Sequence, residues 1–417
     1  MQSPDERRSA IAWALYDCGN SGFATTVMAG FFPLFFKQYW SAGSSVTEST
    51  SQLGLANSLA SVGVALLAPV LGAVADAGRG KKRWLAGFAA VGCMATAALS
   101  LVAKGDHASA TAYYALATVG FAGSLVFYDA LLVSVANDAQ SDRVSSLGYS
   151  LGYLGGGVLF AINVAMTLKP ALFGLADAAA GVKASFVTVA LWWAVFTLPL
   201  LARVHERESR SSDSAGAFRR GLSQLTGTFA RVRRMPQVWR FLLAYWLYID
   251  AVDTVIRMAV DYGLSLGLPS QGLIIALLIT QFVGFPAAIV FAKLASRIGA
   301  QRSILIGIAV YCGVTVFGYF MTTAAEFYAL AIVIGLVQGG VQALSRSLYS
   351  RLIPQDEAGE FFGFYNMLGK FAAVIGPTLM GVVGVLTGSS RTAILSLLVL
   401  FIAGALLLMR VQEPNAR

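Results

Sequence analysis

The stretch that decides the fold runs from Ile11 to Phe36 and reads IAWALYDCGNSGFATTVMAGFFPLFF. It is apolar and long enough to cross a bilayer, yet its first half carries Tyr16, Asp17 and Asn20. A carboxylate at membrane depth costs about 2.5–3.5 kcal/mol, so it normally faces a cavity, pairs with another group or binds protons and substrate. At 100° per residue, Asp17, Asn20 and Ser21 share one stripe of the helix. This stripe predicts either a functional site or a buried hydrogen-bond cluster between helices.

The composition of the whole chain agrees with a membrane protein. The 417 residues are 57% hydrophobic and only 12% charged, and the mean hydropathy is +0.69. Such values exclude a soluble fold with a charged surface. The three cysteines, Cys18, Cys93 and Cys312, lie inside apolar segments and show no metal-ligand spacing. We therefore expect no metal, no cofactor and no catalytic constellation.

Twelve apolar segments predict twelve transmembrane helices, and no short alternating segments of a β-barrel type occur. They cover about 11–36, 53–77, 84–103, 111–136, 145–168, 184–203, 238–266, 271–294, 303–323, 326–349, 361–387 and 392–410. Six precede and six follow a polar segment rich in Ser, Arg and Gly. We therefore divide the chain into an N-terminal half (1–203), a linker (204–236) and a C-terminal half (237–417). The plan resembles the major facilitator fold, an all-α membrane protein of two pseudo-symmetric six-helix halves.

The distribution of positive charge predicts the orientation. If the N-terminus is inside, 23 of the 30 lysines and arginines fall in cytoplasmic segments and 5 in outside segments. Positive residues accumulate on the cytoplasmic side, so both termini and the linker are expected there, in a multi-pass protein of the cell inner membrane. The first apolar run is too long for a signal-peptide core and is read as a retained helix. The net charge of +9 is explained by this asymmetry and by contact with anionic lipid, without a nucleic-acid partner.

The predicted seventh span carries a second group of charges. Asp250, Asp253, Thr254, Arg257 and Asp261 are spaced so that they share one helical face. Arg257 can pair with Asp253 or with Asp261, which leaves at least one carboxylate able to load and release a proton. The alternative is a wholly structural ion cluster, with Asp261 at the outer membrane surface.

Further polar residues occur in three other spans. Tyr128 and Asp129 lie in the fourth span, Gln338 and Gln342 in the tenth, and Lys370 in the eleventh. In major facilitators the first, fourth, seventh and tenth helices line the central cavity, which is where most of these residues fall. Lys370 is a candidate partner for a carboxylate or for an anionic group of a substrate.

A loop motif predicts a conformational latch. The segment GAVADAGRGKKRW, residues 72–84, resembles the cytoplasmic loop signature of the superfamily, although Ala77 stands where an arginine is expected. Gly72 permits close helix packing, and Asp76 can interact with a basic group or a helix N-terminus across the interface of the halves. Gly72, Asp76 and Arg346 are the predicted latch residues.

Several stretches resemble one branch of this superfamily, the vacuolar amino-acid effluxer of autophagy and its bacterial relatives. They read WALYDCGNSGFATTV (13–27), SSLGYSLGYLGGG (145–157), GLVQGGVQALSRSLYSRLIP (335–354) and EFFGFYNMLGKFAAVIGP (360–377). At Cys18 and Gly19 the family more often has an aromatic residue and Ala. The resemblance implies export of small polar metabolites without ATP, amino acids in the fungal members.

These observations lead to a specific hypothesis. We expect a monomeric secondary transporter that works by alternating access, binds a small-molecule substrate within the bilayer and couples its movement to protons. Asp17, Asp250 and Asp253 are the expected proton or substrate-amine sites. Asn20, Tyr16, Tyr128, Asp129, Arg257, Gln338, Gln342 and Lys370 complete the expected substrate and proton site, and Asp17 could equally belong to an inner gate. The alternatives are a multidrug exporter, or a membrane sensor or assembly partner that keeps the fold without transporting.

Overall fold

The protein is described by a computed structural model that covers residues 4–42, 63, 64, 67, 70, 71, 80–206, 230–265, 268 and 270–412. Its secondary structure across these residues is helical throughout, with no strand. Eight of the helices are long and apolar enough to cross a bilayer. The prediction of an all-α membrane protein is thereby confirmed.

The helices form two consecutive sets, which we call the first set and the second set. The first set comprises α1 (Pro4–Gly22), η1 (Phe23–Phe31), α2 (Phe32–Phe35), η2 (Phe36–Trp40), α4 (Lys81–Ala98), η3 (Leu99–Leu101), α5 (His107–Ala130), α6 (Leu132–Val135), α7 (Ser141–Leu168), η4 (Pro170–Phe173) and α8 (Ala178–Arg203). The second set comprises α10 (Pro236–Ser265), α11 (Ser270–Ile298), α12 (Ala300–Phe320), α13 (Ala324–Leu352), η5 (Gln355–Glu357), α14 (Ala358–Thr387), α15 (Ser390–Leu395) and α16 (Leu397–Leu408). They match eleven of the twelve predicted spans; the second span, 53–77, lies almost wholly outside the described residues.

The first span is less regular than the sequence predicts. After α1 the chain passes into π-helical turns over Phe23–Phe31 and again over Phe36–Trp40. Pro33, between them, lacks the N–H that an α-helix would use and its ring crowds the preceding turn. Wider turns of this kind are frequent at functional sites.

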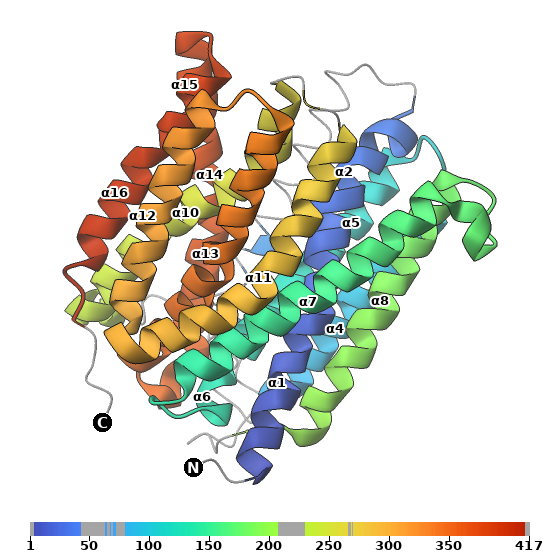
Figure 1. Cartoon of the computed structure of the whole chain (residues 1–417). Coiled ribbons are helices and arrows are strands. Elements are labelled where there is room, and N and C mark those ends of the chain that lie inside the picture. Colours follow the sequence, from blue (N-terminus) through green and yellow to red (C-terminus); the bar gives the residue numbers. More distant parts are fainter. Residues whose placement is uncertain are drawn as a thin grey trace.

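Helix pairings of the first set recur in the second. In the first set α1 packs against α7 and α8, and α4 packs against α5 and α8. In the second set α10 packs likewise against α14 and α16, and α12 against α13 and α16. Between the sets, α7 lies along α11 and α13, as Figure 1 shows at the front of the molecule, and α5 contacts α14.

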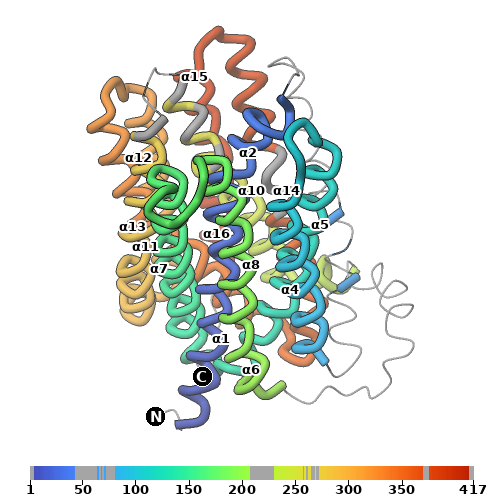
Figure 2. Tube along the Cα trace, turned by 90° about the vertical axis from the view of Figure 1, so that its right-hand side faces the viewer, coloured from blue at the N-terminus to red at the C-terminus, as the bar shows by residue number. Residues whose placement is uncertain are grey.

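The start of α1 and the end of α16 lie at the same end of the helical bundle, the lower end in Figure 1. We call this end the termini face. The view turned by 90° shows α4, α5 and α8 side by side on one flank of the first set, with the chain ends again at the bottom (Figure 2). The helix ends at the termini face include the starts of α1, α7 and α14 and the ends of α8 and α13.

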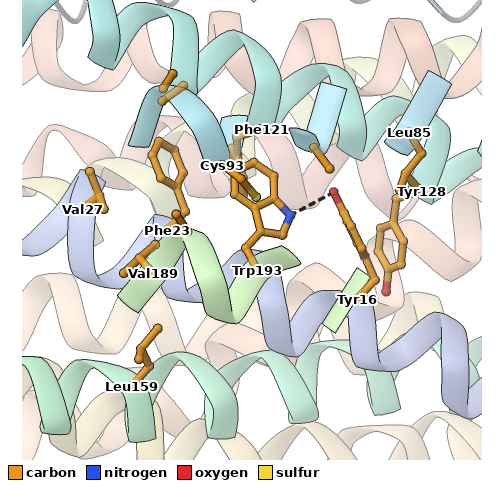
Figure 3. Packing of buried hydrophobic residues seen from close by; sticks show 14 of the residues in the cluster. Tyr16, Phe23, Val27, Leu85, Cys93, Phe121, Tyr128, Leu159, Val189 and Trp193 are labelled. Carbon is orange, nitrogen blue, oxygen red and sulfur yellow. Dashed lines mark hydrogen bonds between the residues drawn. The ribbon is translucent and has the colours of Figure 1, made fainter. Parts of the chain in front are cut away.

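Each set is built around a buried apolar cluster. One cluster draws on residues between Ala10 and Val204, and another on residues between Val232 and Val411 together with Ala130 and Val133 of the first set. In the first cluster Trp193 packs against Phe23 and Phe121, and its indole N–H donates to the Tyr16 hydroxyl at 3.2 Å (Figure 3). The division at residues 203 and 236 stays a prediction, because residues 207–229 of the linker lie outside the described part.

Candidate functional site

A buried arginine joins the two sets near the termini face. Arg346 lies on α13, and its side chain is only 3% exposed. Its Nη1 donates to Asp129 Oδ1 at 3.2 Å, and its Nη2 donates to Asp17 Oδ2 at 3.3 Å. The guanidinium also reaches Ser145 through Nε, at 2.9 Å from the hydroxyl, and through Nη2, at 3.0 Å from the backbone carbonyl. All these partners belong to the first set, so one side chain of the second set is held by three helices of the first.

Helix periodicity explains why these groups converge. On α7, Ser141, Ser145 and Gly148 follow one another at intervals of four and three residues, and on α13 Arg346 and Ser350 are four residues apart. Residues at these spacings share one helix face, and the two faces meet where α7 packs on α13. Asp129, close to the end of α5, enters from the side.

Both carboxylates of the cluster have further hydrogen bonds. The Tyr128 hydroxyl donates to Asp17 Oδ2 at 2.8 Å. The Asn366 amide of α14 donates to Asp129 Oδ2 at 2.9 Å. A buried ion pair is stabilising only when hydrogen bonds satisfy the remaining lone pairs, and this cluster meets that condition.

Gly148 makes room for the cluster. A Cβ atom at this position would lie 2.6 Å from Asp17 Oδ2, 2.9 Å from the Tyr128 hydroxyl and 3.1 Å from Arg346 Nη2. All three distances are shorter than ordinary contacts. A side chain larger than hydrogen at residue 148 would therefore displace at least one member of the cluster.

A second layer of contacts lies nearer the termini face. Arg351 Nη1 is 2.7 Å from Asp142 Oδ1, and the Ser347 hydroxyl also donates to Asp142. The hydroxyls of Ser141 and Ser350 are 2.8 Å apart. These contacts, which we call the outer layer, again join α7 of the first set to α13 of the second.

Asp250, on the first helix of the second set, has a different environment. It is fully buried, and its two carboxylate oxygens accept the backbone N–H of Gly376 in α14 at 3.1 and 3.0 Å. Thr254, one turn further on, donates to the same carboxylate at 3.4 Å. A Cβ atom at Gly376 would lie 2.0 Å from Thr254 Oγ1, so glycine is required for this approach of α10 to α14.

Comparison with known proteins identifies the family. A family model described as "Vacuole effluxer Atg22 like" matches residues 43–417. An uncharacterized MFS-type transporter of Bacillus subtilis (strain 168), YxiO, is 38% identical over 410 residues, which cover 97% of this chain and 95% of that protein. The chain belongs to the Atg22-like family of the major facilitator superfamily. This finding confirms the resemblance and excludes an enzyme, since the relatives are transporters.

Fungal members and solved structures agree with this placement of the Atg22-like chain. Autophagy-related protein 22-2 of Aspergillus clavatus is 26% identical over 288 residues, which cover 62% of this chain and 46% of the fungal protein. The Atg22-like chain thus spans about half the length of this fungal relative. The crystal structure of the human organic anion transporter MFSD10 superposes with a TM-score of 0.76 at 16% identity, covering 98% of this chain and 100% of that one. A variant of the Escherichia coli fucose:proton symporter FucP gives 0.73 at 13% identity, covering 98% of each chain. At such low identity these structures show the fold alone.

The structure brings together some of the predicted site residues and separates others. Asp17, Tyr128, Asp129 and Arg346 of the Atg22-like protein form one cluster. Asp250 lies instead against Gly376 in its own set. Asp17 and Asp250 therefore have different partners, although both belong to the substrate and proton site that is expected from the sequence.

The remaining polar residues of the first and tenth spans are buried or half-buried between helices. Tyr16 is buried in the core of the first set, where its ring lies 5.0 Å from that of Tyr128. Asn20 is buried, and within the described part of the structure its Nδ2 has no hydrogen-bond partner. Gln342 is half-buried and accepts a hydrogen bond from the Tyr153 hydroxyl at 3.4 Å.

Gln338 lines a separate apolar cavity inside the second set. The cavity measures about 70 Å³ and is bounded by α10 to α16, with residues such as Met258, Leu277 and Phe327 in its wall. Gln338 Oε1 is buried without a hydrogen-bond partner among the described residues.

Asp253 is half-buried on α10.

Several predictions fall outside the described part of the structure. Gly72 and Asp76 of the predicted latch are among the undescribed residues. The helices that carry Arg257 and Lys370 are described, but their side chains are not. Their proposed pairings stay predictions.

Sequence reasoning missed several members of the cluster in this Atg22-like protein. Trp13, Ser145 and Tyr149 all approach the Arg346 guanidinium. They lie within WALYDCGNSGFATTV and SSLGYSLGYLGGG, the stretches that carry the family resemblance. The family resemblance therefore marked the stretches that contain these residues. Helix periodicity could not show that α1 and α7 contact Arg346 on α13, because it describes one helix at a time.

Proposed function

We propose that this protein is a secondary transporter that works by alternating access, and that the structure represents the conformation closed at the termini face. The observation that carries the proposal is the Arg346 guanidinium, which is buried between the two sets and bonded to Asp17 and Asp129. A transporter of this fold opens by rocking one half against the other about a midplane site. Opening at the termini face must therefore break these contacts.

The substrates proposed are small polar or zwitterionic metabolites such as amino acids, and the proposed direction is export. The description of the matching family as vacuole effluxers supports the direction, and the substrate class is proposed from the resemblance to the fungal amino-acid effluxers. The excess of positive residues on the side of the chain ends supports a cytoplasmic termini face. We also propose that the protein is a monomer and that it lies in the cell inner membrane; the Bacillus subtilis relative supports this location.

Proton coupling follows from the charge of the cluster. Separation of the sets removes Arg346 from Asp17 and Asp129, and the repulsion between two neighbouring carboxylates without a cation is costly. A proton bound by either carboxylate lowers that cost. Asp17 and Asp129 are therefore the proposed proton sites, Asp253, Asn20 and Gln342 are proposed cavity contacts, and the amide contact of Asp250 favours a structural role there.

The proposal is tested by locking the termini face. Ser141 and Ser350 have hydroxyls 2.8 Å apart, so the pair Ser141→Cys and Ser350→Cys is placed to form a disulfide in the closed state. We expect oxidation to abolish amino-acid flux into proteoliposomes under an imposed pH gradient, and a reductant to restore it. Each single cysteine variant serves as the control. Full flux in the oxidised pair would contradict alternating access.

The competing hypothesis of a non-transporting sensor predicts a different result. A sensor gives no net flux with any substrate in either redox state of this pair. A multidrug exporter gives flux that responds to cross-linking but carries large organic cations in place of amino acids. The same vesicles, loaded with each class of compound, separate the three cases.

A further inference from the structure

The guanidinium of Arg346 is surrounded by aromatic rings as well as carboxylates. Its Cζ lies 4.8 Å from the centroid of the Trp13 ring, 5.3 Å from that of Tyr128 and 4.5 Å from that of Tyr149. Asp17, Asp129 and Ser145 complete the surroundings. We call these six residues of the first set, Trp13, Asp17, Tyr128, Asp129, Ser145 and Tyr149, the cage.

The cage is held together by contacts that do not involve Arg346. The rings of Trp13 and Tyr128 are stacked, with centroids 4.3 Å apart and planes 10° from parallel. The Trp13 indole N–H donates to the Tyr128 backbone carbonyl at 2.9 Å, and the Tyr128 hydroxyl donates to Asp17 at 2.8 Å. These bonds join α1 to α5 within the first set. The cage therefore keeps much of its shape when α13 moves away.

The chemistry of the cage selects cations. Aromatic faces attract a cation through the ring quadrupole, more strongly when water is excluded. Carboxylates bind guanidinium groups through charge-assisted hydrogen bonds. In the described contacts two carboxylates face one guanidinium, so the cage is left strongly negative when Arg346 departs.

The shape of the cage favours a guanidinium over an ammonium. Asp17 and Asp129 accept from different nitrogens of the same planar group, and Ser145 accepts from a third. A guanidinium offers five donors in a rigid plane and stacks on aromatic rings, whereas an ammonium is a compact and strongly hydrated charge. The geometry is thus already matched to a planar cation.

We infer that the cage is a binding site for small organic cations that carry a guanidinium group, and that Arg346 occupies it as a tethered substitute while the termini face is closed. This inference rests on the proposed alternating access, because only opening at this face frees the cage. A free cation entering the cage replaces Arg346 and favours the open state. The preferred cargo would then be a guanidinium-bearing amino acid or amine.

Chemical rescue tests the inference on the full-length purified protein. In Arg346→Ala the cage is empty, and methylguanidinium or agmatine at millimolar concentration is expected to raise the melting temperature by several degrees. Methylurea, a neutral planar analogue, and sodium ions are expected to have no such effect. Equal responses to methylguanidinium and methylurea would overturn the inference.

Two matched variants locate the effect. Arg351→Ala removes an arginine of the outer layer and should not gain the response, because Arg351 is not in the cage. The double variant Arg346→Ala with Asp129→Asn should lose at least about tenfold in affinity for agmatine, since a charged acceptor is replaced by a neutral amide. A response of the same size in all three variants would show that binding occurs elsewhere and would contradict the cage.

A second measurement does not need Arg346→Ala to fold. In the Ser141→Cys and Ser350→Cys pair, agmatine should bind weakly when the disulfide holds Arg346 in the cage and more tightly after reduction. Equal binding in both states contradicts the inference. Because these are binding measurements, their failure with amino-acid flux intact would reject the cage alone, whereas cage binding without any flux would reject the transport proposal.

Discussion

Asp17 and Asp250 occupy similar places in the two sets of helices. Each lies on the first helix of its set, with a hydroxyl residue four positions later, Ser21 or Thr254. Each also packs against glycine in the fifth predicted span of its half, on α7 or α14: a Cβ at Gly148 would lie 2.6 Å from Asp17 Oδ2, and one at Gly376 would lie 3.0 Å from Asp250 Oδ1. The local arrangement, an aspartate packed against a glycine with a hydroxyl residue four positions later, is thus the same in both halves of the fold.

The partners of the two carboxylates differ. Asp17 is bonded across the boundary between the sets, to Arg346. Asp250 is bonded within its own set, to the backbone N–H of Gly376. A rigid-body movement of one set against the other breaks the first contact and leaves the second intact. We therefore propose that Asp17 takes part in conformational coupling and that Asp250 serves helix packing.

The largest effect is expected for Arg346→Ala. Removing one partner of a buried ion pair costs about 3–5 kcal/mol because the remaining charge is left unpaired. Here Asp17 and Asp129 both lose their cation, so we expect amino-acid flux in proteoliposomes to fall by at least tenfold. A tenfold change corresponds to about 1.4 kcal/mol, which is less than the cost of the unpaired charge. Arg346→Lys, which keeps the charge without the planar fork, should give an intermediate flux. Wild-type flux in Arg346→Ala would show that the cluster has no part in the cycle.

The pair Asp17→Asn and Asp250→Asn tests the comparison directly. Asp17→Asn should weaken the dependence of flux on the pH gradient, since the amide cannot take up a proton and Asp129 alone remains as a proton site. Asp250→Asn keeps an oxygen that can accept from Gly376, so its cost should be about 1 kcal/mol of stability with flux close to wild type. Flux assays at several imposed gradients and thermal melts of both variants provide the measurement. If Asp250→Asn loses pH dependence and Asp17→Asn retains it, the assignment is reversed.

The two glycines should respond differently to a methyl group. In Gly376→Ala the new Cβ meets Thr254 Oγ1 at 2.0 Å and Thr254 Cβ at 2.9 Å, so α10 and α14 must separate at a cost of about 1–3 kcal/mol. In Gly148→Ala the new Cβ meets the ends of the Asp17 and Tyr128 side chains, which can move. We expect thermal melts to show the larger loss for Gly376→Ala. Gly148→Ala should mainly reduce flux. Equal losses of stability in the two variants would contradict the assignment of helix packing to one site and conformational coupling to the other.

The smallest effect is expected in the outer layer. Asp142 is 20% exposed where it meets Arg351, and partly exposed ion pairs contribute about 0–1 kcal/mol. Arg351→Gln should therefore change flux by no more than about fivefold, which corresponds to about 1 kcal/mol. A loss as large as that of Arg346→Ala would place the main closure in the outer layer, with the buried cluster as a secondary contact.

Several features were predictable because they depend on short stretches of sequence. Helices occur at eleven of the twelve positions predicted from hydrophobic length, eight of them long and apolar enough to cross a bilayer, and the polar stripe of Asp17 and Asn20 follows from helix periodicity. The pairing of Asp17 with Arg346 was not predictable, since 329 positions separate the two residues. Only the packing of α1, α7 and α13 brings them together.

The contrast between Asp17 and Asp250 has the same origin. The sequence by itself determined a multi-helix membrane protein, since backbone groups in lipid must be satisfied within helices, and it marked which helices carry buried charge. Only the tertiary structure decided the partner of each charge. Pairing depends on which helix faces meet, and those faces are set by packing between segments far apart in the chain: Arg346 reaches Asp17 across the two sets, whereas Gly376 reaches Asp250 within one.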